Sequence, residues 1–364
     1  MFYITLLSLF LYEKQGGKEM SHLQSHKSKF TILLMSFLVL IGSFIGFIAP
    51  AHPVKAASNT LTVVFIPNDS VKEVEPAREA LTKAISKATG KKVQIQTTTD
   101  YNIAIQAIAS GKAQLALLGP DGYIQARSQN KKVEPILTYS GKSGTLKDAY
   151  YHSYIMVPKN KAAEYKKDGQ YSLDKIKGKK MAFVSNTSTS GFAVPAGAIK
   201  TQFKLKDTDQ LSQNGKFFSK VTFAGSHQGS ALSLFKGDVD VAAFDDMDLT
   251  QYGKFINGNE KAGSIFKVNK KASAPFQSVP GKESLAIAAY EVQNEPLVAN
   301  GSQISKGDIA KIQKALTAKA VTNDPHFFAP ENAKQRGLFT KDGQTQFVKV
   351  TDSWYKPTHK VLGK

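Results

Sequence analysis

The chain has 364 residues, with 48 lysines and arginines against 29 aspartates and glutamates, and it has no cysteine. At roughly 100–200 residues per domain, this length predicts about two domains. A disulfide, a cysteine-ligated zinc site, a thiol nucleophile and a lipid-modified cysteine all need that residue, so its absence excludes each of them.

The N-terminal segment is typical of an export signal. Residues 30–49 form an apolar run of about twenty residues without a charge, preceded by Lys27 and Lys29. Small residues near position 56 suit cleavage after Ala56, which makes residues 1–56 a signal peptide. The run is also long enough to span a bilayer, so a retained membrane anchor is the alternative. Residues 1–19 form an unusual prefix, and Met20 is a second candidate for the start of the chain.

Almost all the positive charge of the remaining chain is lysine. From Ala57 onward the formal net charge is about +16, and the whole chain has only three arginines, Arg78, Arg127 and Arg336. Proteins that read nucleic acids depend on arginine for bidentate contacts, so we expect no nucleic-acid partner. The scattered lysines indicate a solvated surface, with loose attraction to anionic wall polymers or lipid headgroups as the alternative.

The chain after the leader alternates strand and helix patterns, in two halves with the same element order. Short β-branched runs predict strands, and apolar residues at helical spacing followed by glycine predict helices. This order predicts an α/β protein with two lobes, each built on a mainly parallel sheet. The predicted strands are 61–67, 93–97, 114–118, 180–184, 221–224, 239–244 and 284–290, and the predicted helices are 75–89, 102–110, 192–203, 230–235, 306–319 and 344–354.

Polar residues follow several of the predicted strands, where open α/β sheets bind their ligands. The most specific segment is the run 185–191, in which six small polar residues and a glycine lead into a helix. Serine and threonine cap helix N-termini, and the free N–H groups there bind anions. A capping loop without a ligand is the alternative explanation. Further candidates follow other strands: Asn68, Tyr123, His227, and Asp245 or its neighbour Asp246.

Six of these segments, in order from Leu61 to Ala320, resemble the substrate-binding proteins of phosphonate, phosphite and phosphate ABC importers. They are the first strand with Pro67, Asp100-Tyr101, the run from Ser110 to Tyr123, Ser188-Thr189-Ser190-Gly191 with Pro195, Ala224-Gly225-Ser226-His227, and Gly237 to Asp246.

The resemblance implies a type II periplasmic-binding fold, with a hinge and a cleft between two lobes. It assigns 57–157 and 268–364 to the first lobe and 158–267 to an inserted second lobe. It implies that Ser188, Thr189 and Ser190 hold the phosphorus oxyanion, and that Tyr123, His227, Asp245 and Asn68 line the cleft. The run Asn68-Asp69-Ser70 departs from the pattern that we expect there.

The function implied by the resemblance is capture of a phosphorus oxyanion outside the cytoplasm and its delivery to an ABC transporter permease. We expect a monomer that needs no cofactor and no metal. An anchored surface receptor or sensor for an anion is one alternative. A phosphoryl hydrolase on the same fold is another, but the sequence has no P-loop and no Gly-x-Ser-x-Gly motif to support it.

Overall fold

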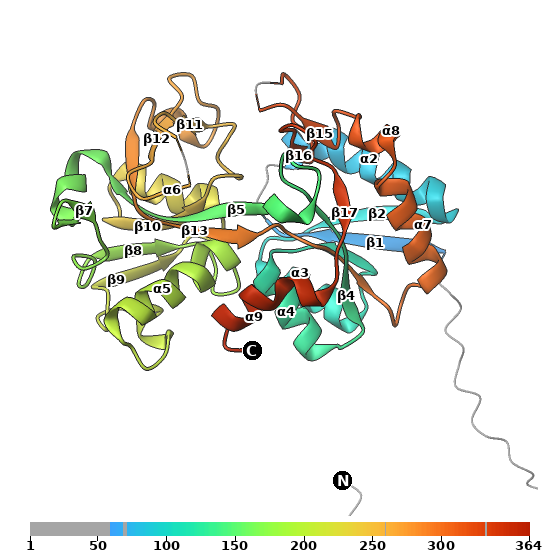
Figure 1. Cartoon of the computed structure of the whole chain (residues 1–364), viewed down its shortest axis with the longest axis horizontal. Helices are drawn as coiled ribbons and strands as arrows, with labels where there is room; N and C mark the ends of the chain where they lie inside the picture. The colour runs from blue at the N-terminus through green and yellow to red at the C-terminus, as the bar shows by residue number, and fades with distance from the viewer. Residues whose placement is uncertain (1–58, 68–70, 259, 332) are drawn as a thin grey trace, which may run out of the picture. The chain divides into compact units, whose positions relative to one another are not determined.

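The computed structural model describes residues 59–67, 71–258, 260–331 and 333–364. Residues 57–364 form one compact unit (Figure 1). The predicted signal peptide or anchor, both candidate start sites and Asn68 lie outside the described residues.

The first lobe is built on a six-stranded sheet with the order β17-β4-β14-β3-β1-β2. β1 pairs in parallel with β2 and β3, whereas β14 and β17 run antiparallel to their neighbours. Its strands are β1 (Thr60–Phe65), β2 (Lys92–Thr97), β3 (Leu115–Leu117), β4 (Val133–Tyr139), β14 (Leu297–Asn300) and β17 (Phe347–Lys349). Its helices are α2 (Val71–Thr89), α3 (Tyr101–Ser110), α4 (Pro120–Gln129), α7 (Lys306–Leu316), α8 (Lys319–Thr322) and α9 (Lys356–Val361).

The second lobe is built on a seven-stranded sheet with the order β11-β12-β13-β5-β10-β8-β9. Only β10, β8 and β9 pair in parallel. Its strands are β5 (Tyr150–Pro158), β8 (Lys180–Phe183), β9 (Lys220–Phe223), β10 (Val241–Asp245), β11 (Gly253–Phe255), β12 (Ile265–Val268) and β13 (Glu283–Gln293), and its helices are α5 (Val194–Phe203) and α6 (His227–Lys236). Two small ribbons complete the described strands: β6 (Lys166–Lys167) with β7 (Gln170–Tyr171), and β15 (Phe328–Ala329) with β16 (Phe339–Thr340).

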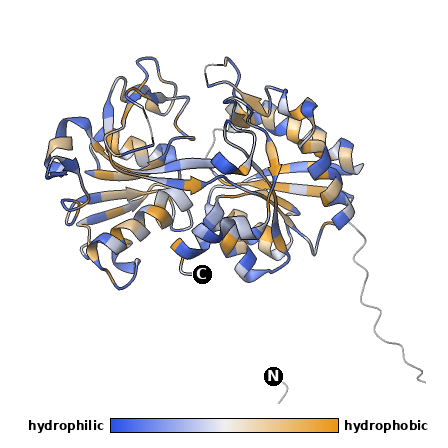
Figure 2. Ribbon diagram, viewed as in Figure 1, coloured by the Kyte–Doolittle hydropathy of each residue, from blue (hydrophilic) through white to orange (hydrophobic). Residues whose placement is uncertain are grey.

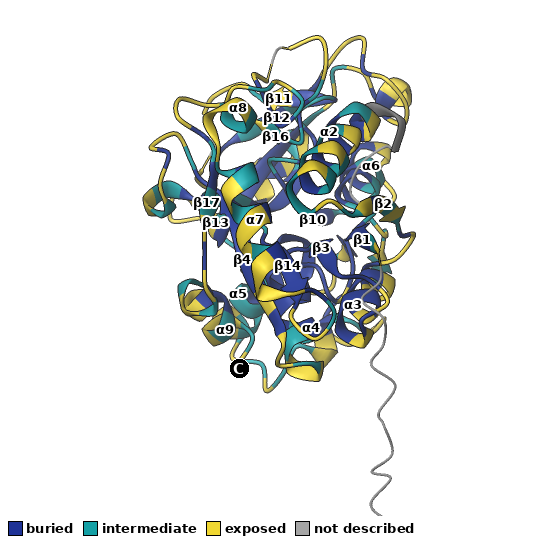
Figure 3. Ribbon diagram, turned by 90° about the vertical axis from the view of Figure 1, so that its right-hand side faces the viewer, coloured by how far each residue is buried: buried dark blue, intermediate teal, exposed yellow. Residues whose placement is uncertain are grey.

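Each sheet has apolar side chains on both faces and helices against both. In the first lobe, Leu81 and Ile85 of α2 pack on one face, and Ala104 and Ile108 of α3 on the other. Figure 2 shows the apolar residues concentrated along the strands, and Figure 3 shows buried strands between helices whose outer faces are exposed. Strands covered on both faces read as continuous apolar runs, which is why the sequence revealed them.

The chain crosses between the sheets twice, through residues 140–149 and 294–296. β5 and β13, which flank these crossings, pair antiparallel with each other from Tyr150↔Gln293 to Pro158↔Ser284. Both strands therefore belong to the second sheet, whereas the predicted lobe boundaries place most of β5 and all of β13 with the first lobe. Because the strands that leave and re-enter a lobe run in opposite directions, each sheet is mixed rather than mainly parallel.

The C-terminal segment packs against these crossings. Trp354, the single tryptophan of the chain, lies 5.9 Å between ring centroids from Tyr150, at the start of β5. The Gln293 side chain donates to the Trp354 carbonyl, and the Tyr355 hydroxyl donates to the Asn294 carbonyl at 2.9 Å. The predicted helix over 344–354 is wrong, because β17 pairs there with β4 and one tight turn follows.

Candidate functional site

The Ser-Thr-Ser segment forms a tight turn that leads into α5. The Ser188 hydroxyl oxygen caps this turn by accepting the Gly191 N–H at 3.1 Å, and a π-helical turn over Thr189–Ala193 precedes the helix. A Cβ atom at Gly191 would lie 2.3 Å from the Val184 side chain, so only glycine fits here. The turn is thereby pressed against the end of β8, and the three hydroxyl residues are buried.

His227 is a neutral hydrogen-bond donor by its geometry. It is the first residue of α6, and its Nδ1 accepts the backbone N–H of Asp245 at 3.1 Å, so the ring proton is on Nε2. Burial lowers the pKa of His227 to about 3, which keeps the ring neutral. Its Nε2 lies 3.3 Å from Asp245 Oδ2 and 3.4 Å from Ser188 Oγ.

Asp245 ends β10 and accepts hydrogen bonds on both carboxyl oxygens. Ser190 Oγ donates to Oδ2 at 3.2 Å, and the Asp248 N–H donates to Oδ1 at 3.1 Å. Burial raises the pKa of Asp245 well above its usual value, and the charge of Asp246 adds to the shift. Asp246 itself turns away and binds His152, with 3.1 Å between Oδ2 and Nδ1. Of the two candidate acids, Asp245 is the one beside Ser190 and His227.

Two tyrosines that sequence reasoning did not select complete this cluster. Tyr101 begins α3 of the first lobe, and its hydroxyl lies close to the Ser188 side chain. The Tyr151 hydroxyl donates to Ser190 Oγ at 3.2 Å. Burial raises the pKa of each tyrosine well above its usual value, so both stay protonated donors. We call the set the buried polar cluster: Tyr101, Tyr151, Ser188, Ser190, His227 and Asp245.

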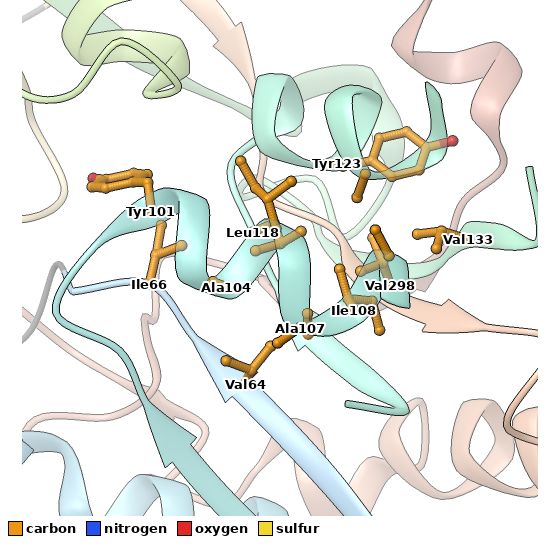
Figure 4. Close-up of a cluster of buried hydrophobic side chains, with 14 of the residues drawn as sticks. Val64, Ile66, Tyr101, Ala104, Ala107, Ile108, Leu118, Tyr123, Val133 and Val298 are labelled. Carbon is orange, nitrogen blue, oxygen red and sulfur yellow. The ribbon is translucent and has the colours of Figure 1, made fainter. Parts of the chain in front are cut away.

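Tyr123 is not part of the buried polar cluster. Its hydroxyl donates to Asp352 at 2.5 Å, and its ring packs on Tyr355 with 5.4 Å between centroids. Figure 4 shows Tyr101 and Tyr123 at opposite ends of the apolar core of the first lobe, on α3 and α4. Tyr123 therefore holds the C-terminal segment rather than facing the predicted ligand. The sequence signal for Tyr101 is the Asp100-Tyr101 pair, in which Asp100 caps α3 and Tyr101 is the first residue of that helix.

Thr189 points to the first lobe. Its Oγ1 accepts the Asp121 N–H at 2.8 Å, at the N-terminus of α4. A Cβ atom at Gly119 would lie 3.0 Å from the same oxygen, so the missing side chain permits this close approach. Thr189 thus joins the two lobes next to the buried polar cluster. Ser188 and Ser190, on either side of it, contribute their hydroxyl groups to the cluster.

A cleft of about 580 Å³ lies beside the cluster, and both lobes contribute to its walls. Tyr151 belongs to the cluster and to the cleft wall, so the two spaces adjoin there. Tyr139 and Phe65 come from the first lobe, and Asp246, Asp248 and the crossing residue Glu295 add carboxylates.

Within the described residues, one group of side chains has the spacing of a metal site. His227, Asp245 and Asp248 each place one ligand atom within 4.8 Å of the others. The same atoms suit a protonated oxyanion, because His227 Nε2–H donates a hydrogen bond and Asp245 accepts one. The serine and tyrosine hydroxyls around them add donors, which an anion uses and a cation does not.

The sequence of the chain is similar to those of known proteins. Residues 63–355 match the family model described as "ABC transporter, phosphonate, periplasmic substrate-binding protein". The phosphate-import protein PhnD of Mycolicibacterium smegmatis is 30% identical over 213 residues, which is 58% of this chain and 62% of that protein. This chain thus spans less than two thirds of that relative.

Solved structures with the same fold include binding proteins from two other bacteria. A binding protein of a Pseudomonas aeruginosa phosphonate transporter has a TM-score of 0.58 and 17% identity, covering 83% of this chain and 85% of that one. PhnD1 of Prochlorococcus marinus, solved with methylphosphonate, has a TM-score of 0.58 and 18% identity, covering 83% and 97%. They confirm the predicted type II periplasmic-binding fold. No helix in the described part of the chain is long and apolar enough to cross a membrane.

Proposed function

Because the chain belongs to the family of periplasmic substrate-binding proteins of phosphonate ABC transporters, we propose that it captures a small phosphorus oxyanion and passes it to an ABC permease. Members of this family serve transport, so the function proposed is binding and release, without catalysis. We propose that the chain works outside the cytoplasm as a monomer.

The observation that carries the proposal is the set of neutral donors that converge in the buried polar cluster. Ser188, Ser190 and His227 come from the N-terminal ends of two helices in the second lobe. Tyr101 reaches the cluster from the first lobe. Hydrogen bonds from preorganised neutral donors stabilise a buried anion and also fix its orientation.

Asp245 gives the proposed site a preference for a singly protonated ligand. A carboxylate beside an oxyanion is repulsive unless one of the two carries a proton. Ser190 and His227 lie on the same side as Asp245 Oδ2, so a P–OH group placed among them has an acceptor within reach. The charge-assisted hydrogen bond that results selects phosphate-like or phosphonate monoanions over fully protonated or fully ionised species.

We also propose that the two lobes close over the ligand by bending at residues 140–149 and 294–296. These segments are the connections between the two sheets. Hinge closure around a ligand is common in two-lobed binding proteins. The Thr189–Asp121 hydrogen bond and the close approach of Tyr101 to Ser188 are the contacts that closure would form.

Calorimetric titration of residues 57–364 tests the proposal. The ligands are phosphate, phosphite, methylphosphonate and an aminoalkylphosphonate, with sulfate as the control because it has no proton near neutral pH. We expect at least one phosphorus oxyanion to bind with a dissociation constant in the micromolar range or below, and sulfate to bind far more weakly. Sulfate binding equal to the best phosphorus ligand would contradict the role of Asp245. Absence of any binding would contradict the function.

A further inference from the structure

Two of the three parallel strands in the second sheet, β8 and β9, carry lysines at their amino ends, whereas Asp238 and Asp240 precede β10. β8 and β9 begin with Lys180 and Lys220, which are register partners. The Gly178 N–H donates to the Phe217 carbonyl at 2.8 Å, which brings the loop before β8 beside the loop before β9. We call the lysines of these two loops and strand starts the lysine edge: Lys177, Lys179, Lys180, Lys216 and Lys220.

The lysine edge is at the opposite end of the strands from the buried polar cluster. Going along β8, the chain runs from Lys180 to Phe183 and then into the turn with Ser188 and Ser190. β9 likewise runs from Lys220 toward His227. The lysines therefore cannot touch a ligand held in the cluster, and the proposed oxyanion binding leaves them without a role.

The stretch of chain that contains the lysine edge has a large excess of positive charge. Residues 159–220 contain 13 lysines and five acids, a net charge of +8 in a fifth of the compact unit. This is half of the net charge of about +16 from Ala57 onward. The hydrophilic ribbon β6–β7, with Lys166 and Lys167, extends from the same lobe (Figure 2).

Acidic neighbours neutralise the lysine edge only in part. Asp240, in the loop before β10, accepts the backbone N–H of Lys180 at 3.0 Å, so one acid lies at this edge. Lys179 lies 3.7 Å from Glu164, whereas Lys177, Lys180, Lys216 and Lys220 are exposed and have no ion pair within the described ranges. Like charges directly opposite on neighbouring strands are destabilising. An anionic partner that covers this edge would remove that repulsion.

We propose that the lysine edge is a contact surface for the anionic phospholipid headgroups of a bilayer. Clustered lysines near a membrane are attracted to anionic lipids and need no binding pocket. Each lysine raises the membrane affinity about fivefold. A surface built from lysine alone suits this diffuse attraction, since arginine is the residue that reads single phosphates in fixed geometry. Such contact concentrates the protein at the membrane while the cleft and the buried polar cluster stay available.

Vesicle sedimentation tests this proposal. Residues 57–364 are used because they form a compact unit without the apolar N-terminal run, which would bind lipid itself. At about 0.05 M salt, we expect binding to vesicles with about 30% phosphatidylglycerol and no binding to pure phosphatidylcholine. The fourfold variant Lys177→Gln, Lys180→Gln, Lys216→Gln and Lys220→Gln should bind at least about tenfold more weakly.

The matched control removes four exposed lysines from the first lobe, so its net charge equals that of the fourfold variant. Its substitutions are Lys87→Gln, Lys112→Gln, Lys131→Gln and Lys314→Gln. It should lose no more than about threefold in vesicle binding, because these charges are spread over several elements. Equal losses in both variants would show that total charge decides, and would overturn the proposal. It would also be overturned by wild-type binding to pure phosphatidylcholine, or by edge-dependent binding to soluble polyphosphate without vesicle binding. The fourfold variant should bind the oxyanion with unchanged affinity, so the result of this test does not depend on the proposed function.

Discussion

The two ends of the parallel strands in the second lobe present opposite kinds of chemistry. At their carboxyl ends, buried hydroxyls and a neutral histidine surround Asp245. At the amino ends of β8 and β9, exposed lysines outnumber the neighbouring acids. Full charges stay hydrated in water, whereas a buried site works with neutral donors whose positions are fixed.

This difference predicts two different responses to solution conditions. Attraction through exposed lysines decreases as salt screens the charges. Binding through buried donors depends on each hydrogen bond and on the protons of the site, and much less on salt. Mutations and pH changes at the buried polar cluster therefore test the comparison.

The largest effect is expected from loss of a hydroxyl in the buried polar cluster. Ser190→Ala removes a donor to a charged ligand, which contributes about 1.5–3 kcal/mol, so affinity should fall about 10- to 150-fold. Ser233→Ala is the control, because that hydroxyl only donates to Gly229 within α6. Titration with the best phosphorus ligand measures both. Wild-type affinity in Ser190→Ala would mean that the oxyanion binds elsewhere.

A pair of tyrosine variants separates ligand contact from packing. Tyr101→Phe removes a hydroxyl from the buried polar cluster and should lower affinity about tenfold. Tyr123→Phe removes the bond to Asp352 and should cost about 1–3 kcal/mol of stability, with affinity unchanged. Titration and thermal unfolding of both variants are the measurements. A reversed pattern would restore the sequence-based assignment of Tyr123 to the ligand site.

The pH dependence of stability reports on the buried histidine. The pKa of His227 is about 3 in the folded protein, against about 6.5 in an unfolded chain. The unfolded state therefore takes up a proton first, so this part of the stability is complete above pH 6.5 and decreases as the pH falls toward 3. The slope is at most about 1.4 kcal/mol per pH unit. Denaturant unfolding from pH 4 to 7 should show a flatter profile for His227→Gln than for His326→Gln, a change far from the cluster.

The smallest effect is expected from Asp245→Asn, as a change in the pH profile of binding. Affinity of the wild type should decrease as the pH rises past the last ligand pKa, because the dianion then meets a carboxylate without a shared proton. The raised pKa of Asp245 acts in the same direction. Asparagine supplies a donor and no charge, so the decrease in affinity with rising pH should be a few-fold smaller than in the wild type. The matched variant Asp246→Asn should change the profile less than Asp245→Asn does, because it removes only a neighbouring charge that raises the pKa of Asp245. Identical profiles in all three proteins would contradict the proposal that Asp245 accepts the ligand proton.

The sequence was most informative where local rules decide the structure. Buried strands such as β1 and capped helices such as α3 were predicted within one or two residues, because apolar runs and Asp100 with Gly111 set their limits. The segment 344–354 was misjudged, since pairing of β17 with a distant strand overrides its helical pattern. The predicted lobe boundaries were misplaced for the same reason, because the pairing of β5 with β13 joins strands more than a hundred residues apart in the sequence.

The site was predicted in part. Ser188, Ser190, His227 and Asp245 follow strands of one sheet, and the rule about strand ends brought them together. Tyr101 comes from the other lobe, and Tyr151 comes from an antiparallel strand of the second sheet. The rule about strand ends gives no signal for either place. Tyr123 was selected by its place after β3, but the side chain points from α4 into the core. Asn68 stays a prediction.

The position of Trp354 has a consequence for spectroscopy. It is the only indole of the protein, and it lies against Tyr150 where one connection between the sheets enters β5. Its backbone carbonyl is bound by Gln293, where the other connection begins. Any bending of these connections changes the surroundings of this one fluorophore. A change in the emission of the unlabelled protein during ligand titration would therefore report the proposed lobe movement, with Trp354→Phe as the reference protein without an indole.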